Sequence, residues 1–313
     1  MSHERRPAGC VARHAAPAMF GRMSSAAQAP RAARLPGLPA PLAMIAGTLS
    51  VQLGGALAVH AFTRTTPLGV TFLRSFFALA ILLVAARSLP RTRAAWRVAL
   101  PLGLVMATMN TCFYEGISRL PLGAAVTIEF WGPIAVAVAT SRRRVDLLWV
   151  ALAVAGVSLF GEGFADAQPA GLALIVAAGG CWAVYIVLGR RLAHSTVGIR
   201  GLAPAVATSA AVLVLPGLVS ARSGLFDARV LAACALLGLC GTAIPYAIEM
   251  YALRRVPART FSVLLSMHPA VAALVGAAVL SQGLDARDAL AIACVVAASA
   301  GALASAARLP TAQ

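Results

Sequence analysis

Apolar runs close to the length that spans a bilayer recur along this sequence, separated by short segments rich in Arg, Pro, Gly or Asp. A helix needs about 20 apolar residues to cross the hydrocarbon core, and lipid offers no partner for open backbone groups. The expected fold class is therefore an all-α membrane protein with ten transmembrane helices. We place the spans at residues 42–60, 68–86, 98–117, 121–140, 146–161, 170–189, 201–219, 229–252, 260–280 and 287–306.

The composition excludes other classes of protein. Of 313 residues, 60% are hydrophobic and 12% are charged, so folding in water would leave more apolar surface than one core absorbs. The net charge of +16 does not indicate a nucleic-acid partner, because the 26 basic residues are all arginine and fall in short clusters between apolar runs. The six cysteines lack metal-ligand spacing and are expected to pack as single thiols. We expect no metal and no cofactor.

The distribution of arginine predicts the topology. With the N-terminus inside, twenty arginines fall on the cytoplasmic side of the ten spans, and the opposite side holds Arg64, Arg119, Arg222, Arg229 and Arg287. This asymmetry follows the positive-inside rule and predicts that both termini are cytoplasmic. Residues 1–41 are expected to form a disordered cytoplasmic tail, with Met19 and Met23 as alternative starts, and residues 307–313 a C-terminal tail.

An internal repeat relates the two halves of the membrane domain. Residues 118–133 (SRLPLGAAVTIEFWGP) match residues 254–269 (RRVPARTFSVLLSMHP) at an offset of 136 residues, with both prolines and the preceding arginine aligned. The halves 42–161 and 170–306 each hold five spans, an odd number, so the second is expected to be inverted relative to the first. Inverted five-helix repeats are typical of secondary transporters, with the substrate site near mid-membrane where the halves meet.

Ionisable residues within spans are the candidates for that site, since each costs on the order of 2.5 to 3.5 kcal/mol in lipid. Glu129 lies near the middle of the fourth span, and Pro133 removes the amide that would bond its backbone carbonyl. This pattern favours a substrate or proton site, with a carboxyl buried for packing specificity as the alternative. Glu249 lies near the cytoplasmic end of the eighth span, where a functional role and contact with the interface both fit.

Arg74 lies about six residues into the second span, where it either binds a carboxylate from a neighbouring helix or substrate, or snorkels to the outer interface. Glu115, near the outer end of the third span, is expected to face water. Neutral side chains that either bind a ligand or bridge helices are Asn110, Tyr114 and Gln52. His60 and His268 are expected to be interfacial or helix-bridging, with a proton relay as the alternative.

Two long strings resemble a known family. Residues 113–137 (FYEGISRLPLGAAVTIEFWGPIAVA) and 243–274 (AIPYAIEMYALRRVPARTFSVLLSMHPAVAAL) are similar to the two repeat signatures of the drug/metabolite transporter superfamily, EamA-type branch. Within that branch they resemble bacterial inner-membrane threonine/homoserine exporters. The resemblance extends over roughly residues 40 to 306. It implies two inverted five-helix repeats, proton-driven export of small amino acids or related metabolites, and roles for Glu129 and Glu249.

The sequence departs from this family at two positions. His268 replaces the acidic residue of the family's usual MEPA string, and Gln282 stands where an acidic residue often follows the ninth span. Because these carboxylates are absent, the resemblance does not identify the coupling ion or the substrate.

We therefore expect an inner-membrane exporter of amino acids or related metabolites that works by alternating access and is coupled to protons. One alternative is an exporter of other metabolites or cationic drugs, which predicts a carboxyl-lined cavity without arginine. An intramembrane enzyme is the remote alternative, because the chain has no HExxH, no GxSxG and no cluster of Cys and His ligands. The oligomeric state stays open between monomer and homodimer.

Overall fold

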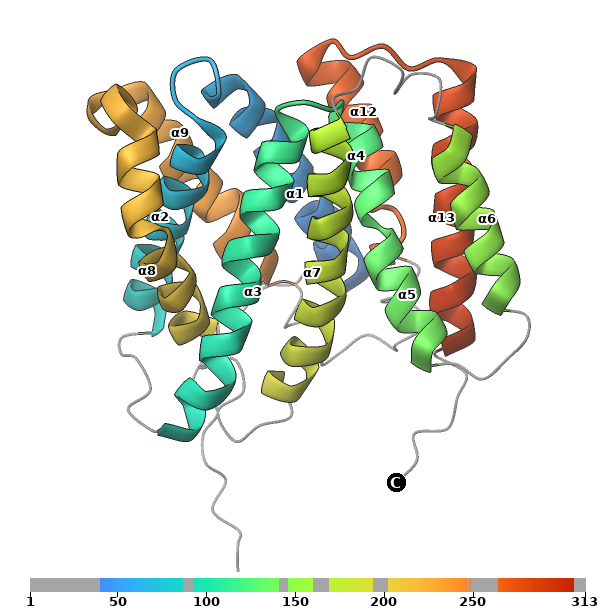
Figure 1. The fold of residues 1–313 in the computed structure, drawn as a ribbon, viewed down its shortest axis with the longest axis horizontal. Coiled ribbons are helices and arrows are strands. Elements are labelled where there is room, and N and C mark those ends of the chain that lie inside the picture. The colour runs from blue at the N-terminus through green and yellow to red at the C-terminus, as the bar shows by residue number, and fades with distance from the viewer. Residues whose placement is uncertain are drawn as a thin grey trace, which may run out of the picture. The chain divides into compact units, whose positions relative to one another are not determined.

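The computed structural model describes residues 40–86, 93–140, 146–159, 169–193, 202–246, 248 and 264–306. All of them lie in one of the chain's two units, Pro39–Gln313. Most of the described residues are helical, and none of them lies in a strand. The helices are α1 (Ala40–Ala61), α2 (Pro67–Ala86), α3 (Arg93–Ile117), α4 (Leu122–Glu129), α5 (Trp131–Thr140), α6 (Asp146–Leu159), α7 (Pro169–Ala193), α8 (Leu202–Ala221), η3 (Arg222–Phe226), α9 (Ala228–Gly238), η4 (Leu239–Ala243), α12 (His268–Leu280) and α13 (Ala286–Ala306) (Figure 1).

The all-α class expected from the sequence is confirmed in this part of the chain, and the described helices overlap the ranges expected for spans. Stretches that are long and apolar enough to cross a membrane are Leu42–Ala61, Pro67–Val84, Pro169–Gly189, Leu202–Ala221 and Ala228–Tyr246. Large apolar side chains also lie on the outside of the bundle, among them Val84 and Val219, each about four-fifths exposed (80% and 79%). Such an outer surface suits lipid rather than water.

The expected single helix over residues 121–140 is in fact two helices, α4 and α5, that meet at Phe130. Proline has no amide, and its ring clashes with the carbonyl four residues earlier. In this segment that pair is Pro133 and the Glu129 carbonyl, so the proline explains why α4 ends at Glu129.

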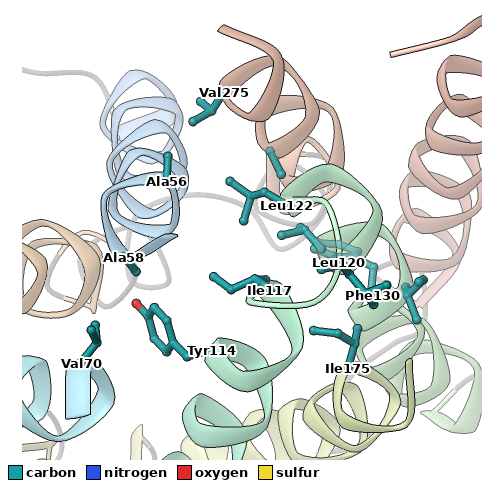
Figure 2. Packing of buried hydrophobic residues seen from close by; sticks show 14 of the residues in the cluster. Ala56, Ala58, Val70, Tyr114, Ile117, Leu120, Leu122, Phe130, Ile175 and Val275 are labelled. Carbon is teal, nitrogen blue, oxygen red and sulfur yellow. The ribbon is translucent and has the colours of Figure 1, made fainter. Parts of the chain in front are cut away.

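Helix α4 occupies the centre of the bundle, because every one of its residues is buried. It packs against α12, α7 and α13. The main apolar cluster surrounds it, with contributions from α1, α2, α3, α7 and α12 (Figure 2). Further pairs of packed helices are α2 with α8, α6 with α13, α3 with α7 and α8, α9 with α2, and α1 with α12, α9 and η4.

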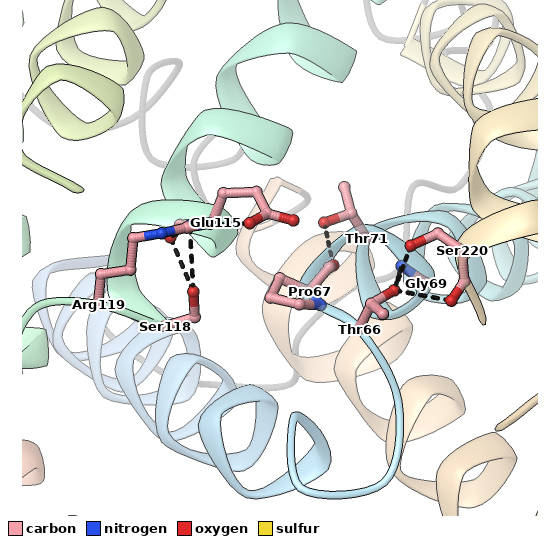
Figure 3. A network of polar contacts seen from close by, with 8 residues as sticks. All are labelled: Thr66, Pro67, Gly69, Thr71, Glu115, Ser118, Arg119 and Ser220. Carbon is pink, nitrogen blue, oxygen red and sulfur yellow. Dashed lines mark hydrogen bonds and ion pairs between the residues drawn. The ribbon is translucent and has the colours of Figure 1, made fainter. Parts of the chain in front are cut away.

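Polar contacts gather at the helix ends, as Figure 3 shows for the start of α2, the end of α8 and the end of α3. The Thr66 hydroxyl lies 2.5 Å from that of Ser220 and joins α2 to α8. Glu115 forms an ion pair of 2.8 Å with Arg119 and keeps 24% of its side chain exposed, in agreement with its expected place at the water interface.

The start of α9 is fixed by Asp227, whose carboxylate accepts a hydrogen bond of 2.8 Å from the Arg229 amide. This bond lowers the pKa of Asp227 below its ordinary value, and the nearby charge of Arg64 acts in the same direction. Arg64 and Asp227 also form an ion pair of 3.4 Å, which joins the turn after α1 to the start of α9.

Candidate functional site

A cavity of about 170 Å³ lies within the bundle, lined by residues of α1, α2, α3, α4, α7, α12 and the segment around η4. Both halves of the chain contribute to it. Six of the residues that were singled out from the sequence line this one cavity: Gln52, Arg74, Asn110, Tyr114, Glu129 and His268. Glu249 lies outside the described residues.

Arg74 points into the bundle rather than toward the interface, since only 4% of it is exposed. Its Nη1 donates to the Thr242 hydroxyl at 2.7 Å and to the Gly241 carbonyl at 3.3 Å. The guanidinium lies over the ring of Tyr114, 5.0 Å from the centroid, in the geometry of a cation–π contact. Its Nε is buried without a hydrogen-bond partner among the described residues. The cation is therefore oriented by neutral groups and keeps a donor free.

The partners of Arg74 come from η4, a π-helical turn that continues α9. Turns of this kind interrupt the regular hydrogen bonding of a helix and are frequent at functional sites. Pro245 lacks an amide, so the carbonyl four residues earlier, that of Gly241, is free to accept from Arg74. The neighbouring Cys240 carbonyl accepts a bond of 2.7 Å from Ser50 of α1. This π-helical turn was not predicted from the sequence, although the spacing of Gly241 and Pro245 repeats that of Glu129 and Pro133.

Glu129 is the last residue of α4 and is 8% exposed, so its carboxyl opens only onto the interior. The C-terminal end of a helix carries partial negative charge, which disfavours a second negative charge there. Within the described part of the chain, the ion pairs are Arg64 with Asp227 and Arg119 with Glu115, and neither includes Glu129 or Arg74. The cavity thus contains a cation and a carboxyl that do not neutralise each other.

The break between α4 and α5 is held close to α7. A side-chain Cβ on Gly132 would lie 2.0 Å from the Gly179 carbonyl oxygen, so only glycine allows this approach. The indole of Trp131 donates a hydrogen bond of 3.0 Å to the Val176 carbonyl. These contacts fix where Glu129 enters the cavity.

Neutral polar groups line the remaining walls. Asn110 donates to the Met106 carbonyl at 2.7 Å, which leaves its amide oxygen without a partner among the described residues. Thr48 of α1 lies 3.0 Å from Nε2 of His268, and Gln52 donates to the His268 carbonyl at 3.4 Å. His268 thus bridges α1 and α12, one of the two arrangements expected for it. Thr48 was not singled out from the sequence.

Aromatic rings enclose these polar groups. Phe130 and Trp182 pack edge to face with their ring centroids 5.0 Å apart. The ring centroids of Tyr185 and Tyr246 are 6.0 Å apart. Phe113, Trp182, Tyr185 and Tyr246 line the cavity. A ligand that fills it must therefore present an apolar body together with a few polar groups.

Three other nominated residues lie away from this cavity or serve the fold. His60 is exposed and its Nδ1 lies 3.0 Å from the Ala56 carbonyl of its own helix. The side-chain oxygen of Gln282 accepts a bond of 3.0 Å from the Leu122 amide, and thereby caps α4. Glu115 is paired at the end of α3.

Comparisons with known proteins identify the family of the chain. Residues 169–304 match the EamA-like transporter family. The threonine/homoserine exporter RhtA of Salmonella typhimurium (strain SL1344) is 40% identical over 267 residues, 83% of this chain and 90% of that protein. The Escherichia coli (strain K12) protein of the same name is 39% identical over 269 residues, 82% of this chain and 89% of that protein.

A crystal structure of another protein has the same fold, with a TM-score of 0.60 at 20% identity, and the match covers 86% of this chain and 99% of that one. The resemblance stated from the two signature strings is confirmed by the family match and the two relatives. The chain is a multi-pass membrane protein that belongs to the EamA-like transporter family.

Proposed function

We propose that this protein is a secondary transporter that exports small amino acids across the bacterial inner membrane. The observation that carries the proposal is that one cavity is lined by a guanidinium, Arg74, and a carboxyl, Glu129, that form no ion pair with each other. An α-amino acid carries the complementary groups, an ammonium and a carboxylate, on one carbon atom. Its carboxylate fits the free donor of Arg74, and its ammonium group fits the carboxyl of Glu129. Hydrogen bonds between ionised groups are about twice as strong as neutral ones, which favours a zwitterion over a singly charged ligand.

The relatives support the same substrate class, since those at 39–40% identity are named threonine/homoserine exporters. The rival proposal, an exporter of cationic drugs, predicts a cavity without arginine. Arg74 lines the cavity and is 96% buried, given its exposed fraction of 4%. A buried guanidinium repels a cation, so we disfavour this alternative.

We infer that the two halves are inverted repeats, and that their relative movement opens the cavity alternately to the two sides of the membrane. An offset of 136 residues relates α1 to α7, α2 to α8, α3 to α9 and η4, α5 to α12, and α6 to α13. Packing between equivalent helices supports this relation: α2 packs on α8, and α6 packs on α13. The contact of α3 with α7 likewise has its counterpart in that of α9 and η4 with α1. A two-fold axis between the halves accounts for all of these contacts.

Coupling to protons is part of this proposal. The carboxyl of Glu129 has room for either a proton or a substrate ammonium group, and each neutralises it inside the membrane. A transporter in which these two ions compete for one carboxyl exchanges them across the membrane.

Export of a panel of labelled compounds tests the function. Cells with and without the protein are preloaded with threonine, homoserine, other amino acids or a cationic dye, and the rate of efflux is measured. We expect the protein to accelerate efflux of small zwitterionic amino acids, and a collapsed proton gradient to remove the effect. Acceleration of dye efflux alone would support the rival function.

We also propose ten spans with both termini in the cytoplasm, because twenty arginines then lie on the cytoplasmic side and five on the other. Single cysteines introduced at Ala165 and Asp285 in a cysteine-free variant should react with a membrane-impermeant thiol reagent added from the periplasmic side. Cysteines introduced at Arg143 and Arg190 are the controls and should be protected. Labelling of residues 165 and 285 only from the cytoplasm would contradict the topology.

A further inference from the structure

One wall of the cavity carries polar groups that the two charges do not use. Thr48 and Gln52 come from α1, one helical turn apart, and His268 is the first residue of α12. The Thr48 hydroxyl lies 3.0 Å from Nε2 of His268, and all three residues line the cavity. They face it beside the rings of Phe130 and Trp182, whose centroids lie 6.0 and 6.3 Å from that of His268.

We propose that Thr48 and His268 form a subsite for a hydroxyl group on the side chain of the substrate. This inference rests on the proposed function and adds the residues that set its specificity. It assigns the charges of the amino acid to Arg74 and Glu129, and the polar part of its side chain to the wall between α1 and α12.

The chemistry of the wall favours a hydroxyl over other groups. A neutral imidazole has one donor and one acceptor nitrogen, and a threonine hydroxyl has one donor and two acceptor positions. After Thr48 and His268 have bonded to each other, each still has capacity for at least one more partner. A hydroxyl can donate or accept, so it satisfies this pair in either tautomer of His268.

An apolar side chain of the same size is expected to be rejected. The flanking rings of Phe130 and Trp182 restrict His268, so it is not free to turn toward another partner. A methyl group in place of the hydroxyl would leave buried polar atoms unpaired, and sites built to bond a hydroxyl discriminate strongly against analogues that lack it. Threonine and valine differ in this one group and are nearly the same in volume, so they are the natural pair for the test.

The test compares threonine and valine export by purified protein in lipid vesicles. For the wild-type protein we expect kcat/KM to favour threonine by about tenfold or more. Thr48→Val removes the hydroxyl from the wall at nearly constant volume. It should slow threonine export, leave valine export unchanged or faster, and lower the ratio about tenfold. Thr48→Ser keeps the hydroxyl and should preserve the ratio.

Thr208→Val is the matched control. Thr208 is buried on α8, bonds the Pro204 carbonyl at 2.9 Å and does not line the cavity. The Thr208→Val variant should leave the ratio of kcat/KM for threonine and valine unchanged.

Equal export of threonine and valine by the wild-type protein overturns the subsite, whether or not the variants fold. A ratio unchanged in Thr48→Val also overturns it. Export of neither amino acid by the wild-type protein overturns the proposed function itself.

Discussion

Glu129→Gln is expected to abolish gradient-driven export of threonine while the protein stays folded and inserted. Glutamine is close to glutamate in shape but binds neither a proton nor an ammonium group as a carboxylate does. Loss of a charge-assisted hydrogen bond costs about 1.5 to 3 kcal/mol, or roughly 10- to 100-fold in affinity. Loss of the exchange between proton and substrate removes the remaining coupled flux. Efflux is measured in vesicles with an imposed proton gradient, normalised to the amount of protein.

Glu129→Asp should impair export without abolishing it, since the acid is retained on a side chain one methylene shorter. Glu115→Gln is the control, because Glu115 lies at the end of α3 in an ion pair with Arg119 outside the cavity. Exposed pairs of this kind contribute about 1 kcal/mol or less, so export should be near the wild-type rate.

A purely structural role for Glu129 predicts that the export rates of the Gln and Asp variants rank in the opposite order. Replacing a buried carboxyl by an uncharged group of similar volume is often neutral or stabilising. In that case Glu129→Gln would export threonine at the wild-type rate, and Glu129→Asp would be the more damaging change because it leaves a small void.

Much of the helical layout was predictable because it depends on local sequence. Helix α13 runs from Ala286 to Ala306, where the sequence predicts 287–306, and α1 runs from Ala40 to Ala61, where it predicts 42–60. Apolar runs bounded by turn residues define such helices without reference to the rest of the chain.

The site was only partly predictable. Charges inside spans are costly, and this alone identified Arg74 and Glu129. The partners of Arg74 in η4 depend on a π-helical turn packed against α1 and α2, which has no periodicity signal of its own. The break at Phe130 follows from Pro133, but its close approach to α7 depends on Gly132 and Gly179, which lie in different halves of the chain.

The hydroxyl subsite had the weakest signal of all. Thr48 is a hydroxyl side chain in a largely apolar span, and most such residues bond the backbone of their own helix, as Thr71 and Thr208 do here. Its significance depends on His268, 220 positions further along the chain. Tertiary packing, and not sequence pattern, brings the two together.

Substitution of Arg74 should reduce the apparent affinity for the carboxylate of the substrate. Arg74→Met keeps an apolar stem but removes all donors, and should lower kcat/KM for threonine by roughly 10- to 100-fold, as expected for loss of a charge-assisted bond. Arg74→Lys keeps the charge but loses the planar group that lies over Tyr114 while it bonds Thr242. Its defect should be smaller and should appear mainly as a raised KM.

A change in the substrate separates recognition of the carboxylate from general damage. In threoninol a hydroxymethyl group replaces the carboxylate, so it has no charge for Arg74 to bind. If Arg74 binds the carboxylate, Arg74→Met should slow threonine transport severely and threoninol transport little, which is the signature of a coupled pair. Arg64→Met is the matched control, since Arg64 lies in a half-exposed ion pair with Asp227. Equal losses for the two substrates in Arg74→Met would assign Arg74 a structural role, because damage to the cavity as a whole does not distinguish a carboxylate from a hydroxymethyl group.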